Sequence, residues 1–198
     1  MNSRFAEIAF TAAVKRLQER DGSRPHYARG EINAATADSM GQSEAAFISE
    51  RDSFYMATVS ETGWPYLQHR GGPKGFLKVL DARTLAFADF RGNRQHVSEG
   101  NLAGNDRVAL ILMDYANRHR LKLLGRARAI DAADDAALLD SLGDAGYRAR
   151  VERAVVIRVE AFDWNCPQHI TPRFSAMELE PVIEALRARI RELEERTR

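Results

Sequence analysis

The sequence lacks several features that would place it in a specialised class of protein. Its 198 residues include one cysteine, which excludes a disulfide within the chain and fits a reducing compartment. The 29 basic and 28 acidic residues nearly cancel to a formal charge of +1, so no overall field attracts nucleic acid or an anionic membrane. No apolar run approaches the roughly 18 residues of a membrane span, and no secretion signal precedes the first helical pattern. We therefore expect a cytoplasmic protein whose anion sites are local.

What is present is a hydrophobic pattern that changes along the chain. Residues 3–20 have apolar spacings of three and four, which predict one amphipathic helix, and residues 21–42 are predicted to be an extended connection. A short helix is expected to begin at a Ser43 cap. Short apolar or alternating runs separated by turn residues then predict an antiparallel meander that closes as a barrel or sandwich. The expected strands are 54–60, 64–69, 75–80, 84–90, 107–113, 120–130 and 153–164, with a helix in 131–143.

The C-terminal residues follow a third pattern. Apolar side chains alternate at spacings of four and three, flanked by Glu and Arg, at Leu179, Ile183, Leu186, Ile190 and Leu193. This spacing predicts an amphipathic helix with a narrow apolar stripe. The helix either packs on its own core or associates with a second copy.

Residues 92–105 are predicted to form a capped helix between two strands. Gly92 and Asn93 stand at its expected start, Arg94 lies in its first turn and Gly104 is at its end. A helix N-terminus presents free N–H groups and a partial positive charge, and a nearby Arg adds a forked donor. The segment therefore suits a phosphate group; the alternative is a capped helix that binds nothing.

A second donor-rich segment, residues 67–80, is predicted to form a hairpin. Gln68, His69 and Arg70 lead into a Gly-Gly-Pro turn, and the returning strand carries Lys78. Glycines in such a turn let a ligand approach the backbone closely. An exposed cationic hairpin is the alternative, but two basic elements in one predicted barrel favour an anion that neutralises both.

These segments resemble a known family in their order and spacing. The stretches FISERDSFYMATVSETGWPYLQHRGGPKGFLKVLD, LAFADFRGNRQHVSEGNLAGNDRVALILMDY and RLKLLGRARAID are similar to FMN-binding split β-barrel proteins related to pyridoxamine 5'-phosphate oxidase. The likeness covers about residues 44–164. It implies a mainly β fold, a six-stranded antiparallel split β-barrel with peripheral α-helices and a C-terminal helix. It also implies a homodimer that binds two FMN molecules at its subunit interface.

The resemblance also assigns residues to the cofactor. Arg120 and Lys122 are expected to reach across the dimer to the second FMN. FMN offers a dianionic phosphate for basic groups, hydroxyls for amides and a flat ring for apolar walls, which agrees with these residue types. The implied contacts are Gln68, His69, Arg70, Lys78, Phe90, Gly92, Asn93, Arg94, Gln95, Ser98, Arg120 and Lys122.

The segment DWNCPQHITPRF, residues 163–174, is open to several interpretations. Cys166 and His169 supply two of the three or four ligands that a metal needs, and the other histidines lack ligand-pair spacing, so no metal is expected. A reactive Cys166 thiol would need a pKa lowered by a neighbour such as His169. The proline that follows Cys166 is equally consistent with a buried, inert cysteine in a stiff turn.

A rigid loop over the flavin is another interpretation of the same segment. Trp164 would supply an aromatic wall, and Asn165, Gln168 and His169 would supply hydrogen bonds, while two prolines reduce the entropy lost on ordering. We add Trp164 and Gln168 to the predicted cofactor contacts and His169 as the candidate catalytic residue. A structural strand end with a satisfied histidine is the alternative.

The predicted organisation has three parts: an N-terminal helix and connection (1–42), an FMN-binding split-barrel domain (43–174) and an amphipathic helix (175–198). We expect an FMN-dependent oxidoreductase acting on a small molecule by hydride transfer. The alternatives are a flavin-binding or sensing dimer without turnover, or a related barrel that uses deazaflavin or haem. Pyridoxamine phosphate oxidases end in a Trp/Arg-rich segment, whereas this chain ends in CPQHITPRF and a charged helix, so oxidation of pyridoxamine phosphate is not expected.

Overall fold

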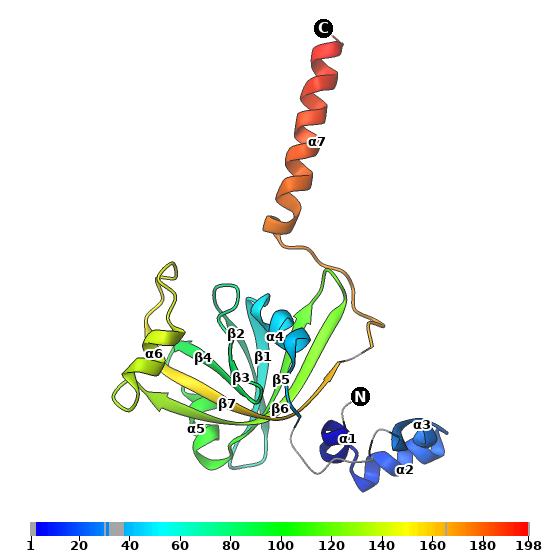
Figure 1. Ribbon diagram of the computed structural model, residues 1–198, viewed down its shortest axis with the longest axis vertical. Helices are drawn as coiled ribbons and strands as arrows, with labels where there is room; N and C mark the ends of the chain where they lie inside the picture. The colour runs from blue at the N-terminus through cyan, green and yellow to red at the C-terminus, as the bar shows by residue number, and fades with distance from the viewer. Residues whose placement is uncertain (1–2, 30, 32–37, 165, 198) are drawn as a thin grey trace.

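A single curled antiparallel sheet forms the body of the protein (Figure 1). The computed structural model describes residues 3–29, 31, 38–164 and 166–197. Its seven strands are ordered β2-β1-β5-β6-β7-β4-β3. Their bounds are β1 Ser53–Val59, β2 Pro65–Gly71, β3 Lys78–Asp81, β4 Thr84–Phe90, β5 Arg107–Asp114, β6 His119–Asp131 and β7 Val151–Trp164.

The core lies inside the curl of this sheet. β1 and β5 alternate between buried and half-exposed residues, which is the period of a strand with one face on the core. Phe54 of β1 stacks on Phe76 at 5.5 Å and meets Phe87 of β4 edge-on at 5.2 Å between ring centroids. These rings bring β1 and β4, which are far apart in the strand order, into contact inside the curl. The alternation along β1 and β5 decides which of their faces points inward.

A bulge bends the two longest strands. The register of β6 against β7 shifts between Leu124 and Gly125. A Cβ atom at Gly125 would lie 2.7 Å from the carbonyl oxygen of Arg158, closer than a side chain tolerates. Glycine is therefore required where the strands cross so closely, and the bend lets the sheet curl toward closure.

The barrel is split between β2 and β4, a gap that we call the split. β2 is an edge strand of the sheet, and backbone hydrogen bonds connect it to β1 alone. A side-chain contact crosses the split instead, since Arg70 Nη1 donates to Asp89 Oδ1 at 2.6 Å. The predicted antiparallel split barrel is confirmed, with seven strands rather than six because the four-residue β3 extends the edge beyond β4.

Several helix boundaries differ from the predictions. The predicted helix over 3–20 is two helices, because the Thr11 hydroxyl caps a new start by accepting from the Val14 N–H at 3.4 Å. The predicted extended connection contains a helix, while residues 30 and 32–37 within it lie outside the described part. The bounds are α1 Ser3–Ala9, α2 Ala12–Arg20, α3 Arg24–Ala28, α4 Gln42–Ser49, α5 Val97–Gly104, α6 Ala136–Leu142 and α7 Ala176–Arg196.

The cap of α4 is not the predicted one. Glu44 Oε2 accepts a hydrogen bond from the backbone N–H of Gly41 at 2.8 Å, so the helix begins at Gln42 and Ser43 lies inside it. The carboxylate also accepts from the indole N–H of Trp164 at 2.7 Å. Glu44 therefore ties the start of α4 to the end of β7.

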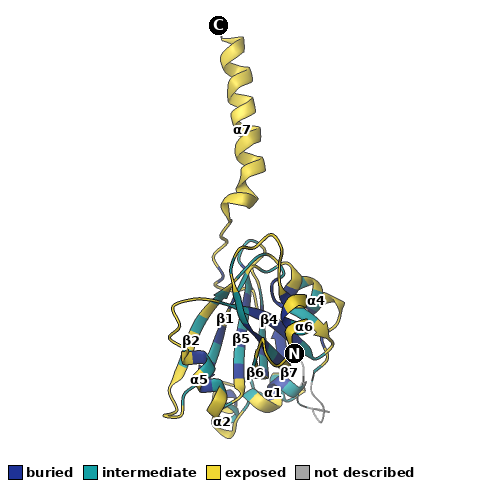
Figure 2. Cartoon of the chain, turned by 90° about the vertical axis from the view of Figure 1, so that its left-hand side faces the viewer, coloured by how far each residue is buried: buried dark blue, intermediate teal, exposed yellow. Residues whose placement is uncertain are grey.

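The last helix stands away from the barrel (Figures 1 and 2). Every residue of α7 is exposed, its apolar ones included. The Ser175 hydroxyl accepts from the Glu178 N–H at 3.2 Å, which stabilises the first turn. Within the described ranges, no helix combines the length and apolar character needed to cross a membrane.

Candidate functional site

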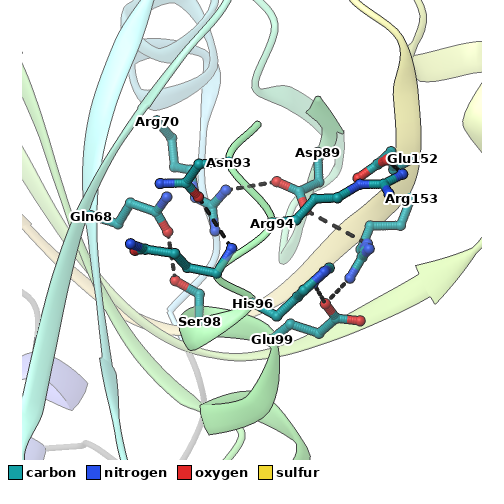
Figure 3. Close-up of polar contacts among 11 residues, drawn as sticks. Gln68, Arg70, Asp89, Asn93, Arg94, His96, Ser98, Glu99, Glu152 and Arg153 are labelled. Carbon is teal, nitrogen blue, oxygen red and sulfur yellow. Dashed lines mark hydrogen bonds and ion pairs between the residues drawn. The ribbon is translucent and has the colours of Figure 1, made fainter. Parts of the chain in front are cut away.

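A hollow of about 280 Å³ opens at the split of the barrel. We call it the hollow. Residues of β2 and β4, the 91–96 loop and the start of α5 meet residues of β6 and β7 there (Figure 3). It is lined by Tyr66, Gln68, Arg70, Asp89, Phe90, Gly92, Asn93, Arg94, Gln95, His96, Val97, Ser98, Glu99, Leu102, Ala129, Glu152, Arg153 and Val155.

Asp89 is the central carboxylate of the hollow. It accepts from Arg70 on β2 at 2.6 Å, and its other oxygen lies 3.7 Å from Nε of Arg153 on β7. All three side chains are largely buried, with exposures of 21%, 16% and 10% respectively. β4 and β7 are paired by their backbones at this position, where Asp89 is the register partner of Arg153, so the carboxylate adds a side-chain link from these two strands to β2.

Glu99, in the first turn of α5, forms the next contact. His96 Nδ1 lies 2.6 Å from Glu99 Oε2, and Arg153 forms an ion pair with the same oxygen. Burial opposes ionisation of this carboxyl, but the hydrogen bonds from His96 and Arg153 outweigh it and hold the pKa of Glu99 below its ordinary value. The carboxylate anchors α5 to β7.

Glu152 pairs with the arginine of the 91–96 loop. Arg94 Nη2 donates to Glu152 Oε1 at 2.8 Å, and the hydrogen bond from Arg94 lowers the pKa of Glu152. The Arg94 side chain is 53% exposed, so solvent reaches its guanidinium. Because water screens such a pair, the guanidinium can exchange its partner for another anion at little cost.

The loop before α5 has an unusual backbone. Arg94 and His96 have φ values of 58° and 55°, in the left-handed region that residues with side chains rarely occupy. This turn prevents a helix from starting at Asn93, and α5 begins at Val97 with His96 at the cap position, four residues later than predicted. No side chain caps its first N–H groups. A strained loop next to uncapped donors is typical of a binding site.

β2 divides its predicted contacts between two faces of the sheet. Gln68 and Arg70 point into the hollow, where Gln68 Oε1 accepts from the Ser98 hydroxyl at 2.8 Å. His69 lies between them in sequence and on the opposite face, with its ring 5.4 Å from that of Tyr55. Because side chains alternate along a strand, these three residues do not converge on one site of the same subunit.

The predicted contacts therefore separate into two groups. The structure brings together Gln68, Arg70, Phe90, Gly92, Asn93, Arg94, Gln95 and Ser98 around the hollow. It places the others elsewhere: His69, Lys78, Arg120, Lys122, Trp164, Gln168 and the candidate catalytic residue His169.

Some of this second group have other contacts. Lys78 on β3 faces α4, in a separate apolar surface depression. Lys122 lies 3.5 Å from Asp163 and 5.0 Å from the ring centre of Phe5 on α1. Arg120 pairs across the sheet with Met113.

The 163–174 segment does not cover the hollow of its own chain. Trp164 ends β7 and packs against Phe47 of α4, with ring centroids 4.8 Å apart. Arg153 lies near the other end of the same strand, and a rise of about 3.3 Å per residue separates the two positions by at most roughly 36 Å along this bent strand. Gln168 and His169 are exposed beyond Trp164. Asn165, which the loop interpretation also used, lies outside the described residues.

The predicted Gly-Gly-Pro turn has a packing role in this chain. A Cβ atom at Gly72 would lie 2.7 Å from Cγ of Phe76, so the core phenylalanine occupies the space beside the backbone. This packing requires glycine at position 72 whether or not a ligand approaches the turn.

Among the described residues, four of the six Arg, Asp and Glu residues that line the hollow were not predicted from the sequence. Asp89 lies inside β4, whose residues 85–88 are all buried, so no alternation of burial marked its direction, and nothing marked its two arginine partners. Glu99, Glu152 and Arg153 were also missed, because they come from elements far apart in the chain. Across the described ranges, no cluster of three or more His, Cys, Asp or Glu is suited to a metal ion.

Comparison with known proteins supplies the family. The sequence model of one family, Pyridoxamine 5'-phosphate oxidase, matches residues 40–165. The chain belongs to this family. The matched range begins just before α4 and ends just after β7, so membership covers the whole barrel and leaves out α1 to α3 and α7. No curated protein matches the sequence.

Several solved structures are similar to this family member. Group A Streptococcus HupZ has 17% identity and a TM-score of 0.49, covering 68% of this chain and 100% of its own. A putative pyridoxamine 5'-phosphate oxidase from Lactobacillus delbrueckii has 19% identity and a TM-score of 0.48, covering 63% and 93%. An FMN-binding protein from Syntrophomonas wolfei has 11% identity and a TM-score of 0.44, covering 62% and 83%. At these low scores the three structures add nothing to the family assignment.

Proposed function

We propose that the protein binds FMN with its phosphate in the hollow and acts, as a homodimer, as a flavin-dependent oxidoreductase on a small molecule. The observation that carries this proposal is the set of donors that converge at the split. Arg70 Nε is buried and has no hydrogen-bond partner in the described part of the chain. Arg94 and the uncapped N–H groups of α5 line the same space. A phosphate group offers several acceptor oxygens to such donors.

The residues fit one part of FMN better than the whole molecule. A pocket that encloses a drug-sized ligand usually measures roughly 300–1,000 Å³, and the hollow is slightly smaller at about 280 Å³. The phosphate and its sugar-alcohol chain suit this volume and the amides of Asn93 and Gln95. The flat ring then requires apolar surface outside the hollow, which a second subunit would supply.

The outward face of the sheet supports a homodimer. Tyr55, Ile111 and Lys122 lie side by side on this face, in adjacent strands. Leu67 on the neighbouring strand is 63% exposed, and His69 shares its face. Apolar side chains with a few basic groups among them suit an interface that also holds a cofactor. His69 and Lys122, which do not line the hollow of their own subunit, would thereby be available to the cofactor of the other.

Bound FMN supplies hydride transfer, so the protein's own residues need to bind, orient and exclude water. Arg70 and Arg94 would hold the negative charge, and Ser98 and Gln68 would fix the start of α5 beside it. Binding without turnover is the second candidate, favoured because Asp89, Glu99 and Glu152 all have basic partners. His169 also lies away from the hollow, so it offers no acid or base to a ligand there within one chain.

FMN titration of the purified protein, followed by visible absorbance, tests the binding proposal. Arg94→Ala should weaken FMN binding by roughly 1.5–3 kcal/mol, about 10- to 150-fold, through loss of a charge-assisted contact. Arg91→Ala is the matched control, because Arg91 also lies near Glu152, at 3.7 Å, but does not line the hollow. Equal affinities in the two variants would place the phosphate elsewhere.

Identification of the bound species separates the remaining candidates. A protein that stays colourless with FMN would contradict the proposal, and a deazaflavin or haem would be recognised by mass spectrometry and its own spectrum. Rapid reduction of bound FMN by NADPH or NADH would support an oxidoreductase. Stable FMN that accepts electrons from neither would favour the second candidate.

A further inference from the structure

The α7 helix has an apolar stripe without a partner in the described structure. Leu179, Ile183, Leu186, Ile190 and Leu193 form this α7 stripe, and each is between 37% and 59% exposed. Most helices in proteins gain their stability by packing an amphipathic face, since isolated helices are marginal in water. Figure 2 shows α7 as an exposed rod beyond the barrel. The stripe therefore lacks the packing that its pattern suits.

The order of residues in the α7 stripe favours one kind of partner. Ile183 and Ile190 occupy the a positions of a heptad, and leucines occupy the d positions. In two-stranded parallel coiled coils, β-branched residues at a and Leu at d are the preferred combination. Pro181 falls at an f position, opposite the stripe, so it does not interrupt the contact face.

Charges beside the α7 stripe are compatible with parallel pairing. In a parallel pair, Arg189 at g faces Glu194 at the following e position of the other helix, and symmetry makes this contact twice. In an antiparallel pair e faces e and g faces g, so the register with residue 183 opposite 193 would place Arg187 and Arg189 each opposite its own copy. The register one heptad away, with residue 183 opposite 186, would place Glu180 opposite Arg187 and is not opposed by charge. The order of Ile at a and Leu at d, rather than charge, therefore favours the parallel arrangement.

We propose that α7 pairs in parallel and in register with α7 of a second copy of this chain. A parallel pair has its two-fold axis along the helices, so both barrels lie at the same end and can share that axis. The pairing would add a second contact between subunits, outside the region that belongs to the oxidase family. It depends on neither FMN nor the site at the split.

Disulfide cross-linking of the full chain tests this arrangement directly. Cysteine is introduced by Leu193→Cys in a Cys166→Ser background, because Cys166 is exposed and would otherwise react. Parallel pairing brings the two 193 positions together and should give a cross-linked dimer on mild oxidation. Antiparallel pairing would separate them by about 15 Å, since they would be offset by about ten residues.

Glu195→Cys in the same background is the matched control. Position 195 is an f position on the opposite face, so little cross-linking is expected there. Equal cross-linking at both positions, or none at position 193, would overturn the proposal. Absence of cross-linking at position 193 is the result expected if α7 packs on its own barrel, binds another protein or pairs antiparallel.

Charge variants provide an independent test in the Leu193→Cys protein. Arg189→Glu should reduce the cross-linking yield several-fold by facing Glu194 with a like charge, and adding Glu194→Arg should restore it. Arg191→Glu makes the same charge change at a b position and should leave the yield unchanged. If Arg189→Glu and Arg191→Glu behave alike, the e and g contacts do not exist. Dimerisation through the barrels alone would not produce this difference.

Discussion

Asp89→Asn removes the charge that links β2 to β7 across the split while keeping the shape of the side chain. Arg70 would lose its carboxylate partner at 2.6 Å, and Arg153 would retain only Glu99. Removing one partner of a buried ion pair costs about 3–5 kcal/mol, because the other charge remains buried and unpaired. The three side chains are between 10% and 21% exposed, and partial screening by water reduces our expected loss to about 2–3 kcal/mol.

Denaturation of the variant in urea and by heat measures this loss. For a chain of this size, each kcal/mol shifts the Tm by about 2–4 °C, so Asp89→Asn should melt roughly 4–12 °C below the parent. Asp106→Asn is the control, because Asp106 and Arg126 form a pair in which both side chains are about half exposed, at 49% and 48%. Its expected cost is about 0–1 kcal/mol. A loss for Asp89→Asn no larger than that of the control would refute the reasoning.

Two further predictions concern the bulge and the N-terminal helices. Gly125→Ala should destabilise the protein by about 1–3 kcal/mol, because the new methyl would lie 2.7 Å from the Arg158 carbonyl oxygen. Gly100→Ala on α5 meets nothing within 4 Å and should be neutral or stabilising, so equal melting temperatures of the two variants would contradict this account. Glu31 accepts hydrogen bonds from Arg24 and then Lys15, which lower its pKa to about 2. The depressed pKa stabilises the folded protein fully above pH 4.5, the ordinary pKa of Glu, and this stabilisation is lost as the pH falls toward 2. Glu31→Gln should therefore lose less unfolding free energy, measured in urea, than the parent does over that pH range. Identical slopes for variant and parent would show that Glu31 is not linked to unfolding.

Strands were predicted well where their own residues determine them. β4, predicted as 84–90, is observed at Thr84–Phe90, because its apolar run is bounded by turn residues on both sides. The split was expected only from the family resemblance. No local pattern shows that β2 stays unpaired on one side, since pairing depends on how the whole sheet curls.

Helix starts were predicted less well, for a physical reason. The 92–105 segment contains Asn93, a good cap residue, yet the left-handed φ values of Arg94 and His96 delay the helix to Val97. Residues with side chains seldom adopt that conformation, so the sequence contains no signal for it. The hollow keeps its shape in part because of this turn.

Only part of the candidate site could be predicted from the sequence. Strict alternation along β2 was sufficient to separate His69 from Gln68 and Arg70, and that signal was missed. The carboxylates of Asp89, Glu99 and Glu152 were beyond prediction, because their partners lie 19, 54 and 58 positions away along the chain. Long-range ion pairs leave no local periodicity.

The contact between Arg70 and Asp89 has a consequence for how this barrel diversifies. Strands joined by backbone hydrogen bonds keep a spacing of about 4.8 Å whatever their side chains are. At the split, two side chains set the width instead, and a single substitution at either position alters it without disturbing a ladder. The size and charge of the opening can therefore drift during evolution while the sheet stays intact. The opening can change while the strand pairing persists, at the cost in stability expected for a substitution such as Asp89→Asn.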